Sequence, residues 1–216
     1  MAHSIILLPL IGFLISCSLS FFKSNKFIDR AAEIITSLFI TVTAIFSFYI
    51  FIDNIGDPSV VSIKLFNWIS SGSFNADWSI YLDTATRVML VVITSVSALV
   101  HIYSIGYMSH DESKPRFMGY LSLFTFAMLM LVTADNFLQL FFGWEGVGLA
   151  SYLLIGFWYK KPTANAAAIK AFIVNRIGDF GLALGIFTIF IVFGSIEYQT
   201  VFSNVCLLYT SPSPRD

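Results

Sequence analysis

Six long apolar segments constrain what this chain can fold into. Each is long enough to cross a bilayer core about 30 Å thick as a helix, which takes roughly 20 apolar residues. The first has no Lys or Arg before it, unlike a signal peptide, so we expect it to remain as a span. The pattern predicts an all-α polytopic membrane protein of about six transmembrane helices. The segments run approximately over 4–22, 31–52, 84–107, 117–134, 137–158 and 166–194.

The composition excludes most soluble classes. The 216 residues are 57% hydrophobic and only 12% charged, which leaves too few charges to cover a soluble domain. A formal net charge of -1, without a basic block, argues against nucleic-acid binding. Cys17 and Cys206 are far apart, and the chain has no nucleotide-binding or dinucleotide-binding motif. We therefore expect no cofactor and no metal site in this chain.

Charges in the loops predict the orientation. The loops at 53–83 and 134–136 hold Lys64 as their only Lys or Arg. Because Lys and Arg collect in cytoplasmic loops, the N-terminus is expected on the outer side, in the periplasm of a bacterium or the intermembrane space of a mitochondrion. The opposite loops, at 23–30, 108–116 and 159–165, hold seven: Lys23, Lys26, Arg30, Lys114, Arg116, Lys160 and Lys161.

Two stretches outside the spans differ from them in composition: the outer loop is rich in turn residues, and the end of the chain is rich in Ser and Pro. In the outer loop, Trp68 and Trp78 flank the turn-rich stretch SSGSFNAD, which fits either a short β-hairpin at the membrane surface or an irregular interfacial loop. The last residues, CLLYTSPSPRD (206–216), are rich in Ser and Pro, and we expect a non-native tail. The rest divides into residues 1–64 with the first two helices, 65–116 with the outer hairpin and third helix, and 117–204 with helices four to six, the start of a truncated larger domain.

Glu145 is the strongest functional signal, because an ionisable group within a span costs roughly 2.5–3.5 kcal/mol on insertion scales. It lies about 12 Å below the outer surface of the fifth span. Gly143, Gly146 and Gly148 surround it, and small residues let a neighbouring helix approach closely. We expect Glu145 to face protein or water. The alternative is an acid that only locks helices together.

The sixth span carries Lys170, Arg176 and Asp179. Arg176 and Asp179 are spaced i, i+3 on one face, at depths of about 15 and 20 Å from the inner surface. These depths bracket that of Glu145, and a short loop makes the two spans antiparallel neighbours, so one buried network is expected. The alternative is an Arg–Asp pair that neutralises itself. Lys170, about 6 Å from the inner surface, either joins this path or snorkels to the interface.

His101, in the third span, is also about 6 Å from the inner surface. The ordinary pKa of imidazole, about 6.5, suits proton exchange with the cytoplasm, although a lone His in a span often bonds one helix to another. A buried acid beside a movable cation can hold or release a proton. Because the chain has no nucleophile with its base, no haem ligand pair and no iron–sulfur Cys set, the predicted chemistry is a proton relay.

The stretches LQLFFGWEGVGLASYLLIGFWY and ANAAAIKAFIVNRIGDFGLALGIF resemble the largest antiporter-like membrane subunit of respiratory complex I, subunit L or chain 5 of NADH–quinone oxidoreductase. The likeness covers most of residues 65–194 and includes DWSIYLDTATRVMLVVITSVSALVHIYSIGYMSHDESKPRF and LVTADNFLQLF. GWEGVG and VNRIGD are specific to this family; the apolar runs around them are not. The chain would be an N-terminal fragment, because family members are several hundred residues long.

The resemblance implies an antiporter-like bundle in a proton-pumping subunit of an oxidoreductase. It carries no redox centre: NADH, FMN, iron–sulfur clusters and quinone would bind partner subunits. Glu145 would be the essential mid-membrane acid, Arg176 and Asp179 the charged pair that tunes it, and His101 the histidine of an H-x-Y-S/A motif. The lysine that partners the acid lies beyond the residues present. Partners would be the other complex I membrane subunits, above all a neighbouring antiporter-like subunit, in a bacterial or mitochondrial inner membrane.

Two other functions stay open. The first is the large subunit of a multisubunit Na+/H+ antiporter. That family shares an equivalent acid but usually lacks the GWEGVGLASY and VNRIGD motifs. The second is a scaffold subunit whose buried charges only fix helix packing. Under the scaffold reading, neutral substitutions would impair assembly and leave pumping per assembled complex intact.

Overall fold

A computed structural model describes residues 1–22, 25–56, 59–72 and 74–210, with side chains as far as Val205. Within these residues six helices are long and apolar enough to cross a membrane, which confirms the predicted spans with boundaries shifted by a few residues. A shorter helix, α7 (Tyr198–Thr210), follows them. The six are α1 (Ala2–Ser20), α2 (Lys26–Asp53), α3 (Thr84–Tyr107), α4 (Lys114–Val132), α5 (Phe137–Ile155) and α6 (Pro162–Phe193).

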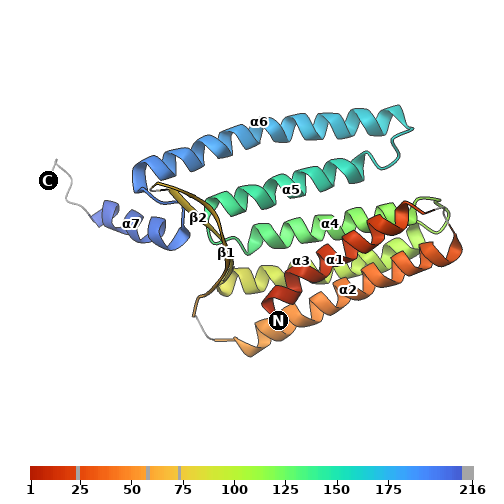
Figure 1. Cartoon of the computed structure of the whole chain (residues 1–216), viewed down its shortest axis with the longest axis horizontal. Coiled ribbons are helices and arrows are strands. Elements are labelled where there is room, and N and C mark those ends of the chain that lie inside the picture. Colours follow the sequence, from red (N-terminus) through yellow and green to blue (C-terminus); the bar gives the residue numbers. More distant parts are fainter. Residues whose placement is uncertain (23–24, 57–58, 73, 211–216) are drawn as a thin grey trace.

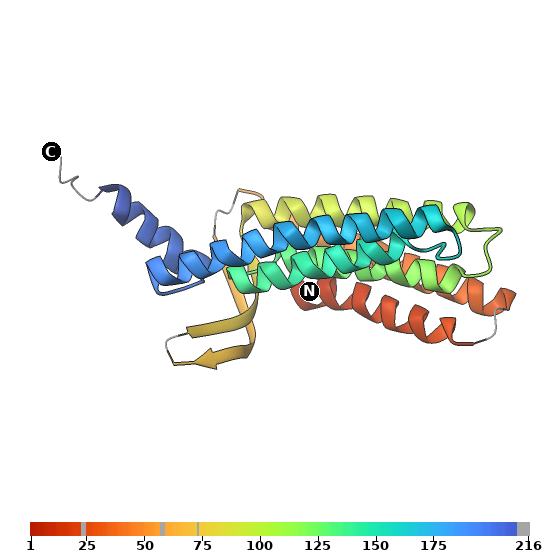
Figure 2. The same cartoon turned by 90° about the horizontal axis from the view of Figure 1, so that it is seen from above.

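The helices form a layered bundle with α4 near its middle (Figure 1). α4 packs against α1, α2, α3 and α5, whereas α6 lies along the outer side of α5 and contacts α7 at its end. Figure 2 shows the same helices running side by side, with the β-strands and α7 at one end. α5 and α6 are therefore antiparallel neighbours, as their short connecting loop predicts.

Local chemistry explains where several helices begin and end. The side chains of Asp83 and Asn136 accept hydrogen bonds from the backbone N–H groups of Thr86 (2.7 Å) and Gln139 (2.9 Å), so they cap the N-termini of α3 and α5. α6 ends at Gly194, whose φ of 67° is in the left-handed region that favours glycine. These caps satisfy backbone groups that the helices themselves leave unpaired.

Six basic residues gather at one end of the bundle, where α2, α4 and α6 begin. We call this the basic end, defined by Lys26, Arg30, Lys114, Arg116, Lys160 and Lys161. Lys23, which also belongs to the predicted set, lies outside the described residues. The opposite end, where α5 begins, carries the strands and is called the hairpin end. Which side of a membrane each end faces stays a prediction.

An antiparallel β-hairpin occupies the outer loop, which decides between the two readings of that stretch. Strand β1 (Val61–Ser71) pairs with β2 (Phe74–Leu82), with Lys64 opposite Ser79 and Asn67 opposite Asp77. Part of the turn, Ser73, lies outside the described residues.

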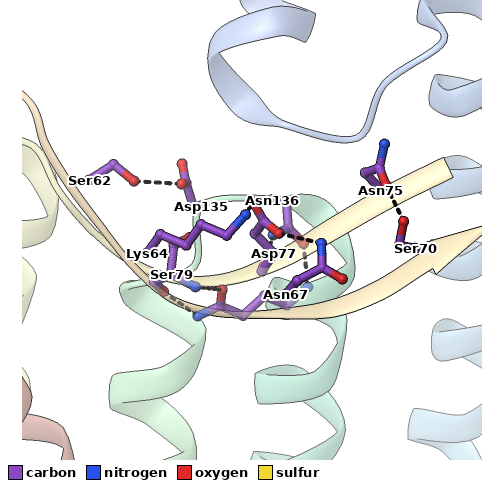
Figure 3. Close-up of polar contacts among 10 residues, drawn as sticks. Ser62, Lys64, Asn67, Ser70, Asn75, Asp77, Ser79, Asp135 and Asn136 are labelled. Carbon is purple, nitrogen blue, oxygen red and sulfur yellow. Dashed lines mark hydrogen bonds and ion pairs between the residues drawn. The ribbon is translucent and has the colours of Figure 1, made fainter. Parts of the chain in front are cut away.

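The hairpin is anchored to α5 through backbone groups (Figure 3). The amide of Gln139 accepts from Ser79 N–H (3.0 Å) and donates to Ser79 C=O (2.8 Å). Asn136 Nδ2 donates to Asp77 C=O (2.8 Å), while the Asp77 carboxylate pairs with Lys64 and accepts from Asn67 Nδ2. The hairpin is thus held across the start of α5.

Two tyrosines lie where α7 meets the hairpin end. Burial raises the pKa of Tyr198, and the Asp135 carboxylate and Tyr81 raise it further. Burial also raises the pKa of Tyr81, together with Asp83 and Asp135. The backbone of 206–210 continues α7, and residues 211–216 lie outside the described residues. That 206–216 is a non-native tail therefore stays a prediction, as do the boundaries after residues 64 and 116.

A buried ion pair joins α2 to α4 near the basic end. Lys114 Nζ lies 3.6 Å from Glu33 Oε1, and the Glu33 side chain is 5% exposed. Glu33 was not among the predicted site residues, although a charge inside a predicted span was the signal for it. Glu33 Oε1 has no hydrogen-bond partner among the described residues. The buried charge of Glu33 is therefore compensated by Lys114.

Lys114→Met should therefore destabilise the bundle. Breaking a buried ion pair leaves an uncompensated charge and costs roughly 3–5 kcal/mol. The free energy of unfolding in mixed micelles, titrated with SDS, measures the loss. Lys160→Met, at an exposed lysine of the same end, is the matched control. Equal unfolding free energies for both variants would show that Glu33 does not need Lys114.

Candidate functional site

The facing sides of α5 and α6 bring three charged side chains together. Arg176 Nη1 contacts Glu145 Oε2 across the two helices and lies 3.5 Å from Asp179 Oδ2 on its own helix. We call Glu145, Arg176 and Asp179 the acid–arginine cluster. The network expected from matched depths is therefore present in the structure, and Arg176 is the group that joins its two acids.

The three side chains differ in exposure. Asp179 is the most enclosed at 8%, Glu145 is 23% exposed and Arg176 is 39% exposed. Trp144 Nε1 donates to Asp179 Oδ1 (2.8 Å), which leaves the other carboxylate oxygen facing Arg176. Asp179 is thus fixed from two directions, whereas Arg176 is open on one side.

Aromatic rings support the arginine from the direction of the basic end. The Arg176 guanidinium carbon lies 4.5 Å from the centre of the Phe172 ring, one turn earlier on α6. That ring in turn lies 5.2 Å from the ring of Tyr152 on α5. A guanidinium over an aromatic face is attracted by the ring quadrupole, so Phe172 holds Arg176 at the height of Glu145.

Glycines let α5 approach its neighbours closely. A Cβ on Gly143 would lie 2.6 Å from the backbone of Leu131 on α4, and one on Gly146 would lie 3.0 Å from Ala127 Cβ. On the opposite side, a Cβ on Gly148 would lie 3.9 Å from Asn175 Nδ2 on α6. The expected close approach around Glu145 is therefore confirmed, and it is tightest toward α4.

The cluster contains one cation and two carboxylates, so its formal charge is -1. Arg176 Nη1 faces both acids and lies nearer Glu145 than Asp179. Arg176 is the only cation in an ion pair with either carboxylate among the described residues, so both acids depend on it for a charge partner.

The other two predicted site residues lie apart from the cluster. Lys170 is exposed on α6, nearer the basic end, and makes no ion pair with any described residue. His101 is buried between α3 and α4, where Nδ1 lies 2.8 Å from Ser97 C=O and Nε2 lies 3.2 Å from Ser122 Oγ. These contacts make His101 a link between two helices. Functional roles for both residues stay predictions.

Among the described residues, no group of three or more His, Cys, Asp or Glu side chains is arranged so that it could hold a metal ion. Trp144 was not among the predicted site residues. Its only signal was its position beside Glu145 in the chain, which does not reveal that the indole would reach Asp179 on the next helix.

Family models match two regions of the chain. Residues 68–118 match the N-terminus of chain 5 of NADH-ubiquinone oxidoreductase (complex I). Residues 134–213 match the transmembrane domain shared by NADH:quinone oxidoreductase and Mrp antiporters, which includes the whole acid–arginine cluster. The chain belongs to the complex I chain 5 family. The resemblance seen in the GWEGVG and VNRIGD motifs is thereby confirmed.

Relatives within the chain 5 family include proteins of Rickettsia felis and Chondrus crispus. The chain is 56% identical to NADH-quinone oxidoreductase subunit L of Rickettsia felis over 184 residues, which cover 85% of this chain and 28% of that protein. It is 53% identical to NADH-ubiquinone oxidoreductase chain 5 of Chondrus crispus over 203 residues, 94% of this chain and 30% of that protein. The chain thus spans less than a third of the length of these relatives.

Solved structures share the fold at low identity. The Mrp complex from Dietzia sp. superposes with a TM-score of 0.71 at 22% identity, over 91% of this chain and 20% of that one. An archaeal membrane-bound sulfane sulfur reductase superposes with a TM-score of 0.77 at 16% identity, over 93% and 39%. The antiporter-like bundle expected for the chain 5 family is therefore the observed fold.

Proposed function

We propose that this chain is the N-terminal part of the proton-translocating membrane subunit of an NADH–quinone oxidoreductase. The acid–arginine cluster carries the proposal, because it holds two carboxylates and one arginine inside membrane-spanning helices. Electron transfer from NADH to quinone takes place on other subunits, where NADH, FMN, iron–sulfur clusters and quinone bind. This chain supplies no redox centre.

In this role Glu145 takes up and releases the transported proton. While Arg176 contacts Glu145, the carboxylate is stabilised as an anion. When Arg176 shifts toward Asp179, the free energy of keeping a negative charge on Glu145 rises and the group binds a proton. Asp179 is held by Trp144, so it offers a fixed second position for the arginine.

The family and the loop charges support a proposal for the setting of the subunit. It is a multi-pass protein whose partners are other complex I membrane subunits, among them a neighbouring antiporter-like subunit. We place the basic end in the bacterial cytoplasm or mitochondrial matrix, because Lys and Arg collect on that side. The N-terminus of α1 then faces the periplasm or intermembrane space.

A second candidate is the large subunit of a Na+/H+ antiporter. The likeness of the fold to a chain of the Mrp complex favours it. The names of the relatives at 50–56% identity favour the oxidoreductase. A purely structural role for the charges is the third candidate.

Arg176→Gln, placed in the full-length subunit of an assembled complex, tests the proposal. Proton translocation per electron should fall roughly tenfold, because Gln keeps hydrogen-bonding atoms but cannot shift a charge between two acids. Acidification of inverted membrane vesicles, divided by the rate of NADH oxidation, measures this ratio.

Arg30→Gln is the matched control, since Arg30 is an exposed arginine at the basic end. A normal ratio in Arg176→Gln would contradict the proposal. Replacing Na+ by choline distinguishes the antiporter, whose H+ movement would stop without Na+. Poor assembly with normal pumping per assembled complex would indicate the structural role.

A further inference from the structure

A cavity of about 470 Å³ lies at the basic end, between α4, α5 and α6. A second cavity of about 460 Å³ adjoins it and shares Arg116, Phe157 and Tyr159 with the first. Lys160 and Lys161 line the second cavity only. The three residues of the acid–arginine cluster line neither cavity. Arg116 is the charged residue common to the two.

Arg116 is fixed in place by contacts that do not neutralise it. Its Nη2 donates to Phe157 C=O (3.2 Å), and its guanidinium carbon lies 4.8 Å and 5.3 Å from the ring centres of Phe157 and Tyr159. It forms no ion pair with any residue of the described ranges. A guanidinium has five N–H donors in a planar fork, so most of them remain for a ligand.

Two acids, Asp111 and Glu112, line the second cavity. Asp111 accepts from Trp158 Nε1 (3.0 Å) and from Ser113 N–H (2.8 Å), which occupies both of its carboxylate oxygens. Glu112 lines the second cavity and is exposed. Against these two acids stand three cations, so the walls carry an excess of positive charge. A held arginine with free donors in such a surrounding suits a phosphate group.

The first cavity also has an apolar wall that continues into the membrane-spanning region. Leu153 on α5 and Ile169 on α6 line it. Ile169, Ile173 and Ile177 are all exposed and follow one another at i, i+4, i+8 on α6. They therefore form an apolar ridge that leads away from Arg116 toward the middle of the helix. Free phosphate would make no favourable contact with this apolar ridge, whereas an acyl chain could pack along it.

We propose that the Arg116 cavity binds an anionic phospholipid, with the phosphate on Arg116 and an acyl chain along the Ile169–Ile173–Ile177 ridge. Lys160 and Lys161 at the rim add attraction for the headgroup. Basic pockets between helices at a membrane interface are suited to such headgroups. This site does not depend on the proton chemistry proposed for Glu145.

Native mass spectrometry of the full chain, released from nanodiscs, tests the site. In nanodiscs of equal parts phosphatidylglycerol and phosphatidylcholine, the wild type should retain phosphatidylglycerol in preference to phosphatidylcholine. Arg116→Gln should lower the retained phosphatidylglycerol roughly tenfold, as expected when a charge-assisted contact is lost. Arg30→Gln, at an exposed arginine of the same end that lines neither cavity, should retain the wild-type amount.

A second variant and a phosphate control also test the lipid site. Lys160→Gln leaves the packing of Arg116 untouched and should lower retention about threefold, so the test stands even where Arg116→Gln folds poorly. Inorganic phosphate added to lipid-free detergent should not produce an adduct. Equal retention of both lipids by the wild type, wild-type retention in both Arg116→Gln and Lys160→Gln, or a stable phosphate adduct would each overturn the lipid site.

Discussion

Glu145→Gln in the full-length subunit should abolish proton translocation and leave the complex assembled. The amide has nearly the same shape as the carboxylate and still accepts a hydrogen bond from Arg176 Nη1, which contacts Glu145 in the structure. It cannot bind and release a proton, however. The expected loss is roughly 100-fold or more in proton translocation per electron, the scale of losing an acid–base group. Vesicle acidification at a measured rate of NADH oxidation gives this ratio.

Glu112→Gln is the control for that experiment, because Glu112 is an exposed acid at the basic end. It should pump normally. Normal pumping in Glu145→Gln would remove Glu145 from the path and leave the acid–arginine cluster with a packing role only.

Gly143→Val should prevent the bundle from folding. Even the Cβ of the new side chain would lie 2.6 Å from both N and Cα of Leu131. Backbone atoms of α4 cannot rotate away as a flexible side chain would, so α5 must move. Gly143→Ala alone should cost about 1–3 kcal/mol, the usual range for overpacking, and the larger Val should exceed it. SDS titration in mixed micelles measures the unfolding free energy, and size-exclusion chromatography measures the folded fraction.

Gly178→Ala on α6 is the matched control, since nothing lies within 4 Å of a Cβ built there. That variant should fold as the wild type does. If Gly143→Ala were equally stable, the contact between α5 and α4 would have to be looser than the structure shows.

The membrane-spanning helices and the acid–arginine cluster could be predicted from the sequence because both follow from one-dimensional quantities. Segment length and apolarity define a span, and residue counting gives depth at 1.5 Å per residue. Counting placed Glu145 level with Arg176 and Asp179, and the structure has them in contact. The alternation of charged loops likewise predicted which residues share the basic end.

Counting along one helix does not show which way a side chain faces. His101 and Lys170 were predicted at similar depths, yet the first is enclosed between α3 and α4 and the second is exposed. The pairing of Glu33 with Lys114 could not be found by counting, because Lys114 belongs to a distant loop in the sequence. Such pairings depend on the rotation of each helix about its axis, which tertiary packing decides.

The anchoring of the hairpin by Gln139 has an evolutionary consequence. Both hydrogen bonds of that amide go to the main chain of Ser79, not to its hydroxyl. Substitutions on the outward face of the strands therefore leave the attachment intact, provided that the backbone keeps its path. The outward face can therefore accept substitutions without loss of the attachment, whereas Gln139 can be replaced only by a side chain that both accepts from and donates to a peptide group.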